Sequence, residues 1–145
     1  MKKISILLAF LFTIIQVNAQ DTSKTKQSVQ VSKDDIFKRI TKKGNKVFII
    51  SLDITETIHA NTAINYWGYW NVTTNRSEAD FVLKLETGAI SRVDRSGKII
   101  FLNPATNEEL KTTATLQTEP RKDKNKKRQL IFRLIDEEVK PLFKE

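Results

Sequence analysis

The residues of this chain that could do chemistry begin with two carboxylates and one imidazole. Asp53 and Glu56 lie a few residues before His59, which is the single histidine among 145 residues. His59 could therefore act as a general base oriented by either carboxylate. No Ser or Cys in a nucleophile motif accompanies it. A partly exposed histidine on a helix is the better interpretation of this residue.

A further acidic pair, Glu78 and Asp80, comes directly before a predicted strand. Residues two apart across a turn have no defined separation for acid–base work. An Asp before a strand can instead accept hydrogen bonds from nearby backbone N–H groups and hold the turn. We predict this structural role for Asp80, and an enzyme that uses Asp53, Glu56 and Asp80 is the least favoured interpretation.

The composition narrows the chemistry further. The chain has no Cys, which excludes disulfides, thiol nucleophiles, iron–sulfur clusters and thiolate zinc sites. A single His also excludes most imidazole metal sites. A hydrophobic share of 39% with eight Phe argues against intrinsic disorder, and the length suits one domain. We predict no catalytic residues, no metal and no cofactor.

The clearest candidate binding residues form a basic run at 121–128. This run holds six bases and one acid, so it carries +5 of the formal net charge of +8. Its cationic residues are Arg121, Lys122, Lys124, Lys126, Lys127 and Arg128. Three interpretations stay open: a solvated loop, a contact with anionic envelope polymer or lipid headgroups, and nucleic acid, which is disfavoured because no recognition motif is present. The N-terminal end of a helix dipole is positive and disfavours nearby cations, yet this basic run comes just before a predicted helix. Such a departure from a local preference is a sign of function.

An aromatic cluster is the second candidate for binding. Tyr66, Trp67, Tyr69 and Trp70 surround Gly68. Aromatic faces stack on sugar rings and fill protein interfaces. Trp67 closes a helical stripe and Trp70 alternates along a predicted strand, so we expect at least one of them in the core. Core packing and an exposed binding patch both remain open for the pair.

The N-terminus has the pattern of a secretory signal peptide. Lys2 and Lys3 precede the apolar stretch 4–15, and Ala19 suits cleavage before Gln20. Twelve helical residues span about 18 Å, which is short of the roughly 30 Å hydrocarbon core of a membrane. We therefore expect a signal peptide at 1–19, a flexible lead-in at 20–31, a single α/β domain at 32–145, and export to the periplasm or beyond. Without residues 1–19 the net charge is +6.

The mature chain is expected to alternate helices and strands in the order α-β-α-β-β-β-β-α. Ser32 and Asp35 resemble a capping box, and Gly44 and Gly68 are suited to end helices. Helices are predicted over 33–43, over 55–67 and from about 126, and strands over 46–54, 69–74, 81–93, 98–102 and 109–117. The connections include tight turns at 94–97 and 103–107 and a turn or helical turn at 75–80.

Apolar spacing indicates which faces of these elements are buried. The first helix is expected to bury Ile36, Phe37 and Ile40. The second is expected to bury Ala60, Ala63, Ile64 and Trp67. The last is expected to bury Leu130 or Ile131, together with Leu134, Ile135, Val139 and Leu142. Pro141 should kink or restart the last turn. The strand 46–54 is continuously apolar in its middle, which predicts a central strand buried on both faces. The prediction is an α+β fold, an α/β sandwich: a mixed sheet of about five strands with an antiparallel meander, covered by two to three helices.

Two segments resemble a known family. The segment 67–72 followed by 77–83 is similar to the TolB N-terminal-domain-like group, with relatives among outer-membrane activators of penicillin-binding proteins. Ala79-Asp80, which opens the long strand, is the most distinctive part, and the resemblance covers about 46–145. It implies protein–protein contact in the envelope and no catalytic residues. This chain departs from the lipoprotein relatives because it lacks an anchoring Cys, and neither its basic run nor its added N-terminal helix is expected there.

Together these features predict an exported, non-enzymatic adaptor or binding module that acts through protein contacts in the cell envelope. The alternative is a binder of anionic glycan or lipid headgroups through 121–128, with Trp67 or Trp70 stacking on the ligand. The expected partners are envelope proteins, with an anionic polymer or lipid headgroup as the alternative. We predict no nucleic-acid partner and no transmembrane segment in the mature chain.

Overall fold

The computed structural model describes residues 31–118 and 125–144, so the predicted signal peptide and nearly all of the lead-in lie outside the described residues. Its helices are α1 (Lys33–Ile40), α2 (Ile54–Trp67) and α3 (Lys126–Arg133), and α3 continues into a π-helical turn and a 3-10 turn, η2 (Leu134–Val139) and η3 (Lys140–Phe143). The strands are β1 (Lys46–Ile50), β2 (Asn71–Val72), β3 (Phe81–Ala89), β4 (Arg95–Leu102), β5 (Glu109–Thr112) and β6 (Leu116–Gln117), and a 3-10 turn, η1 (Arg76–Glu78), precedes β3.

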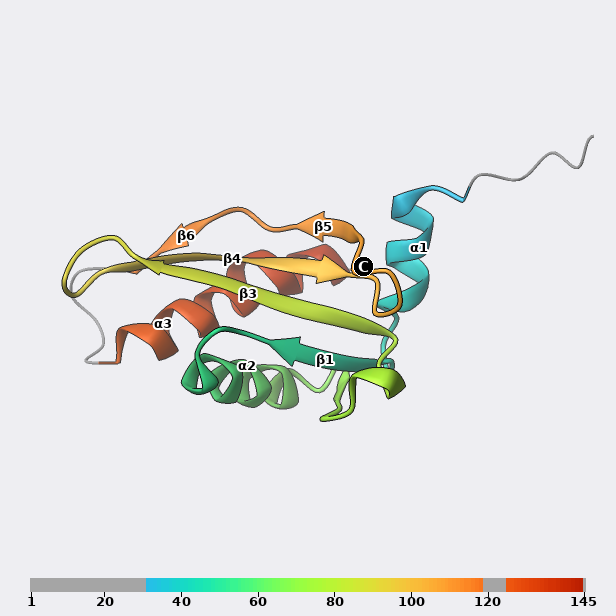
Figure 1. Ribbon diagram of the computed structural model, residues 1–145, viewed down its shortest axis with the longest axis horizontal. Helices are drawn as coiled ribbons and strands as arrows, with labels where there is room; N and C mark the ends of the chain where they lie inside the picture. The colour runs from blue at the N-terminus through green and yellow to red at the C-terminus, as the bar shows by residue number, and fades with distance from the viewer. Residues whose placement is uncertain (1–30, 119–124, 145) are drawn as a thin grey trace, which may run out of the picture.

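The strands form one mixed sheet in the order β2-β1-β3-β4-β5, with β6 beside β4 (Figure 1). β1 runs parallel to both β2 and β3, whereas β4 is antiparallel to its neighbours β3, β5 and β6. The predicted α+β class and the antiparallel meander are confirmed. The described part of the sheet has six strands rather than about five, because the Thr-rich strand expected over 109–117 divides into β5 and β6.

One face of the sheet carries the main core. The odd-numbered positions of β1 and β3 point to this face, where α2 and the C-terminal helical segment pack on them. The predicted apolar stripes of α2 and α3 are confirmed, since the core includes Ala60, Ala63, Ile64, Leu130, Ile131, Leu134, Ile135 and Val139. Leu142 is the exception, because it is 38% exposed and Phe143 packs against the core in its place. Pro141 lies in the 3-10 turn η3, as its expected effect on the last turn suggested.

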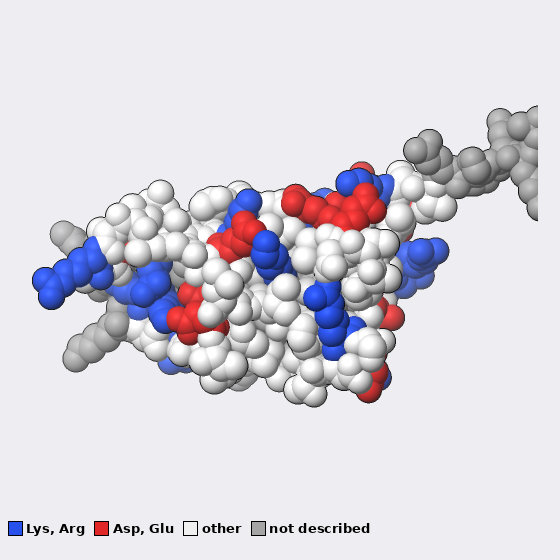
Figure 2. All heavy atoms as spheres, in the orientation of Figure 1, with Lys and Arg blue, Asp and Glu red and all other residues white. Residues whose placement is uncertain are grey.

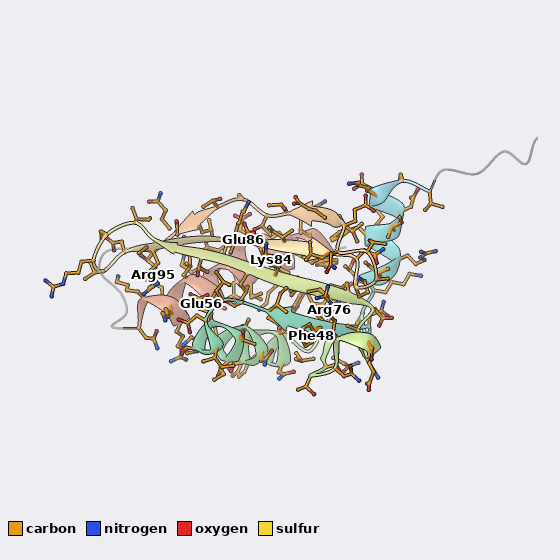
Figure 3. All side chains as sticks on the ribbon, viewed as in Figure 1. Phe48, Glu56, Arg76, Lys84, Glu86 and Arg95 are labelled. Carbon is orange, nitrogen blue, oxygen red and sulfur yellow. The ribbon has the colours of Figure 1, made fainter. Side chains whose placement is uncertain are left out.

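The opposite face of the sheet is only partly covered. It carries a small cluster in which Val82, Ile100 and Leu102 are buried while Phe48 and Ile50 are half-buried. β1 is therefore central, with a strand on each side, but the prediction that it is buried on both faces is wrong. The helices α2 and α3 lie on the other face, and charged side chains such as Lys84 and Glu86 occupy this one (Figure 3).

The β3–β4 hairpin turns earlier than its sequence suggests. Ala89 pairs with Arg95, so the turn lies at 90–94 and the tight turn expected at 94–97 is wrong. The backbone N–H groups of Ile90 and Ser91 donate to the carbonyl of Asp94, and the Ser91 hydroxyl accepts from the Asp94 N–H. Gly97 instead lies within β4, where a Cβ would come within 3.0 Å of the Glu86 carbonyl oxygen. Its lack of a side chain thus serves a close approach between strands and not a turn.

Two further boundaries differ from the prediction. α1 ends at Ile40, and Thr41 is its C-cap residue, whose backbone N–H and hydroxyl both donate to the Phe37 carbonyl. Gly44 takes a positive φ of 86° in the following turn. The strand expected over 69–74 is reduced to the two residues of β2. The end of α2 at Gly68, with φ of 68°, is confirmed.

Candidate functional site

The basic run is only partly described by the structure. Arg121, Lys122 and Lys124 lie outside the described residues. Lys126, Lys127 and Arg128 form the first turn of α3, whose N-cap is Asn125. The Asn125 side chain accepts from the Arg128 N–H at 3.0 Å, which satisfies one of the N–H groups that a helix start leaves unpaired.

The start of α3 lies against the β3–β4 hairpin. Six residues line a shallow, open depression of about 550 Å³, which we call the basic hollow: Arg92, Val93 and Arg95 from the hairpin, Asn125 at the N-cap of α3, and Lys126 and Lys127 from α3. Figure 2 shows Lys and Arg side chains gathered at this end of the molecule. Two segments about 30 positions apart in the sequence thus bring cationic side chains to one concave surface. A surface of this kind attracts anions.

An ion pair ties the basic hollow to the start of α2. The Lys127 ammonium contacts the carboxylate of Asp53, which also caps α2 by accepting from the Thr55 N–H at 2.8 Å. The hydrogen bond from Lys127, followed by that from Thr55, lowers the pKa of Asp53 from 3.8 to about 2. Asp53 is therefore a capping and pairing residue, and its carboxylate stays ionised at neutral pH.

We predict that Lys127→Met raises the pKa of Asp53 toward 3.8, with the Thr55 N–H still holding it below that value. Because the pKa is lowered in the folded state, the pair stabilises the fold above about pH 4, and this contribution is lost as the pH falls toward 2. An NMR titration of the Asp53 carboxyl carbon measures the shift. Lys46→Met is the matched control, since Lys46 lowers the pKa of Glu78 instead. An Asp53 pKa equal in the native chain and in Lys127→Met would contradict the assignment.

Glu56 is the buried carboxylate of this region, and its burial was not predicted. It lies on the inner side of α2 with 3% of its surface exposed (Figure 3). The Ser51 hydroxyl donates to one carboxylate oxygen at 2.7 Å, and the Thr87 hydroxyl donates to the other at 2.7 Å. Glu56 thereby connects the end of β1, the start of α2 and the end of β3. The spacing of Glu56 four residues before the core position Ala60 was the signal that could have revealed it.

The other candidate chemical groups are placed apart. Asp80 accepts from the Lys46 N–H at 2.7 Å, so it holds the start of β1 beside the start of β3. It therefore lies at the opposite end of these parallel strands from Asp53 and Glu56. His59 is half-buried on α2, as expected, with its ring Nε2 3.5 Å from the Asn125 amide nitrogen. Within residues 31–118 and 125–144, no three His, Asp or Glu side chains come together as a metal site.

The aromatic cluster separates into core and surface residues. Trp70 is 2% exposed, and its ring N–H donates to the Thr41 carbonyl at 2.8 Å, so it packs in the core. Trp67 is half-buried and stacks on Tyr69, with the ring centroids 4.7 Å apart. Tyr66 is 91% exposed. Of the two tryptophans, only Trp67 keeps part of its surface at the solvent. The binding patch suggested for the cluster therefore does not include Trp70.

The outward side of α2 carries apolar residues that the core stripe did not predict. Ile54, Ile58 and Tyr66 are 76%, 55% and 91% exposed, and Leu52 just before the helix is fully exposed. We call these four residues the outer stripe of α2. Ile54 and Ile58 are four residues apart, which was the signal in the sequence, since residues four apart are neighbours on one side of a helix. Tyr66 lies about two turns further along, beyond the exposed Thr62.

A second concave surface lies at the α1 end of the molecule. Lys38, Lys42, Lys43 and Lys111, together with aromatic residues and Asp34, line a cavity of about 540 Å³, which we call the α1 hollow. Like the basic hollow it contains several cations, but it is formed mainly by α1 and the segment that follows α1. In the described part of the chain, no helix is both long and apolar enough to cross a membrane.

Comparison with known proteins finds distant likeness. No protein-family model and no curated protein matches the chain. Among solved structures, the PelC dodecamer from Paraburkholderia phytofirmans is 13% identical, with a TM-score of 0.46 over 63% of this chain and 85% of that chain. A point variant of the same dodecamer gives the same identity and TM-score over 86% of that chain. Likeness at this level assigns no role to any residue here.

Proposed function

We propose that this chain is an exported, non-enzymatic adaptor or binding module of the cell envelope that contacts a protein partner through the outer stripe of α2. The observation that carries the proposal is the exposure of Ile54, Ile58 and Tyr66 on α2 and of Leu52 just before it. Exposed apolar side chains gathered on one surface are typical of interaction sites, whereas single ones are common everywhere.

The composition of the outer stripe suits a protein interface. From Ile54 to Tyr66 it runs along about 18 Å of helix, which matches the scale of a groove that receives a helix. Polar residues accompany it, since Thr55 and Asn65 are exposed on the same helix and Thr62 is exposed between Ile58 and Tyr66. An apolar centre with a polar rim and an aromatic anchor is the usual anatomy of such interfaces. The resemblance to the TolB N-terminal-domain-like group implies the same kind of role.

The absence of catalysis is part of this proposal and rests on how the acidic groups are engaged. Asp53 is paired with Lys127, and Glu56 accepts from two hydroxyls. Asp80 holds the start of β1, away from the other two. Acid–base catalysis requires carboxylates that converge on one substrate position. These three carboxylates each have protein partners, and Asp80 lies at the opposite end of β1 and β3 from Asp53 and Glu56.

Site-specific photocrosslinking in cells tests the protein contact. A photoreactive phenylalanine analogue at position 58 or 66 should give a discrete covalent adduct with an envelope protein. The same analogue at Glu108, an exposed loop position on another surface, is the matched control and should give none. Ile54→Ser combined with Tyr66→Ser should abolish the adduct formed from position 58. Equal adducts from positions 58 and 108, or none from 58 and 66, would overturn the proposal.

A second candidate function is favoured by a separate observation, the basic hollow. Here Lys126 and Lys127 of the basic run share a concave surface with Arg92 and Arg95 of the hairpin. Clustered cations in a concavity attract anionic groups more strongly than scattered ones. We propose binding of an anionic glycan or of lipid headgroups at this end of the molecule as the alternative or additional activity.

A further inference from the structure

We infer that the tip of the β3–β4 hairpin inserts into the surface of an anionic lipid bilayer while the basic hollow binds the headgroups beside it. This inference rests on the second candidate function and names its ligand. In Figure 1 the hairpin projects from the end of the molecule opposite α1, and the start of α3 lies at the same end. The two features that would touch a membrane are therefore neighbours.

The tip carries two exposed aliphatic side chains. Ile90 is 51% exposed and Val93 is 63% exposed, and both lie within the turn 90–94. The turn is held by its own hydrogen bonds, from Ile90 N–H to the Asp94 carbonyl at 2.9 Å and from Asp94 N–H to the Ser91 hydroxyl at 3.0 Å. A turn closed in this way presents its aliphatic side chains without first having to become ordered, so little conformational entropy is lost on docking.

Cations surround these aliphatic residues. Arg92 lies between them in sequence, Arg95 begins β4, and both line the basic hollow with Lys126 and Lys127. Among the described residues, three carboxylates also lie in this region: Asp53 is paired with Lys127, Asp94 is bonded to the Ser91 hydroxyl, and the buried Glu56 accepts from the hydroxyls of Ser51 and Thr87. The described cations Arg92, Arg95, Lys126, Lys127 and Arg128 outnumber these carboxylates, so positive side chains are in excess among the described residues of this end.

The combination points to a bilayer rather than to a soluble polyanion. A soluble polyanion offers charge but no apolar phase, and exposed Ile90 and Val93 would gain nothing from it. A bilayer offers anionic headgroups above hydrocarbon, so a protruding aliphatic tip flanked by arginines matches it in both respects. Long Arg and Lys side chains can hold their charges at the headgroups while the aliphatic residues lie deeper.

The α1 hollow supplies a matched control within the same chain. Lys42 and Lys43 line a cavity of about the same volume as the basic hollow, at the other end of the molecule (Figure 1). If clustered cations were sufficient for membrane binding, the two hollows would contribute alike. If the hairpin tip is required, only the basic hollow should matter.

Vesicle sedimentation tests the inference. The full chain, recovered from cells with the same N-terminus in every variant, is mixed with vesicles of phosphatidylcholine alone or with added phosphatidylglycerol. Phosphatidylcholine vesicles alone measure any binding through the N-terminal segment. We expect the partition constant onto the anionic vesicles to exceed that onto phosphatidylcholine and to fall with added salt. Far-UV circular dichroism of each variant verifies that it is folded.

The variants separate the tip from the charge. Ile90→Ser combined with Val93→Ser should lower partition onto anionic vesicles at least about tenfold, because both aliphatic groups leave the hydrocarbon. Arg92→Gln combined with Arg95→Gln should lower it roughly thirtyfold, since each cation near an anionic surface contributes about a fivefold factor. Lys42→Gln combined with Lys43→Gln should leave it within about twofold of the native chain.

A soluble polyanion, dextran sulfate, distinguishes failure of this inference from failure of the second candidate function. The serine variants of the tip should retain binding to dextran sulfate, whereas the glutamine variants of Arg92 and Arg95 should lose it. If the serine variants partition onto vesicles like the native chain while the arginine variants do not, membrane insertion is overturned and anion binding stands. If native protein binds neither anionic probe, or if the Lys42 and Lys43 variant loses as much, both ideas fail.

Discussion

Trp70→Ala is expected to lower the free energy of unfolding by about 3–5 kcal/mol, a far larger effect than a surface substitution has. The Trp70 ring lies 4.8 Å from that of Phe81 and 4.9 Å from that of Phe143 between ring centroids, and it is almost fully buried. Its removal leaves a cavity between the sheet and the end of the chain. It also removes the hydrogen bond to the Thr41 carbonyl, which lies just after α1.

Urea unfolding followed by far-UV circular dichroism measures the Trp70 effect without relying on tryptophan fluorescence. Trp70→Phe keeps most of the ring volume and loses the hydrogen bond, so we expect a loss of about 1–2 kcal/mol. Tyr66→Ala, at an exposed position four residues away, should change the stability by no more than about 0.5 kcal/mol. A change below about 1 kcal/mol for Trp70→Ala would show that the ring is not a core residue.

Glu56→Ala is expected to cost about 1–3 kcal/mol, because it leaves two half-buried hydroxyls, those of Ser51 and Thr87, without their shared acceptor. Through these side-chain hydrogen bonds Glu56 joins α2 to the ends of both β1 and β3. The position of α2 on the sheet, and with it the outer stripe, depends on this connection.

Two controls make the Glu56 prediction specific. Glu56→Gln retains an amide oxygen and can reorganise its bonds with the hydroxyls, so its loss of stability in urea should be smaller than that of Glu56→Ala. A double-mutant cycle with Thr87→Val should show a coupling energy of about 0.5–3 kcal/mol between the two side chains. Additive effects would mean that the 2.7 Å contact between them contributes nothing to stability.

Several local features of the fold follow from the sequence, because their causes lie within a few residues. Ser32 caps α1 by accepting from the Asp35 N–H, as the cap pattern predicted. Gly68 ends α2 in the left-handed conformation that favours glycine. Phe81, Leu83 and Leu85 alternate along β3, and this alternation puts all three on the face of the strand that lies in the core. Each of these depends on a spacing or a preference that a short peptide already contains.

Other features depend on partners that are distant in the sequence. The burial of Trp70 could not be separated from that of Trp67, because β2 has two residues and too little periodicity to set its faces. The burial of Glu56 depends on hydroxyls supplied by Ser51 and Thr87 from the ends of two strands. The prediction put the hairpin turn at 94–97 because glycine is a common turn residue. Gly97 lies instead within β4, where the close approach of the Glu86 carbonyl requires a residue without a side chain.

For the candidate binding surfaces, too, some features follow from the sequence and others only from the tertiary structure. The sequence by itself determined the α+β class, the location of the basic run and the order of the elements up to the division of the last strand into β5 and β6, since these depend on composition and local spacing. Only the tertiary structure joined Lys126 and Lys127 to Arg92 and Arg95, and only it left the outer stripe of α2 at the solvent. The physical reason is that burial and charge clustering are set by contacts between segments far apart in the chain, which packing of α2 and α3 on the sheet creates.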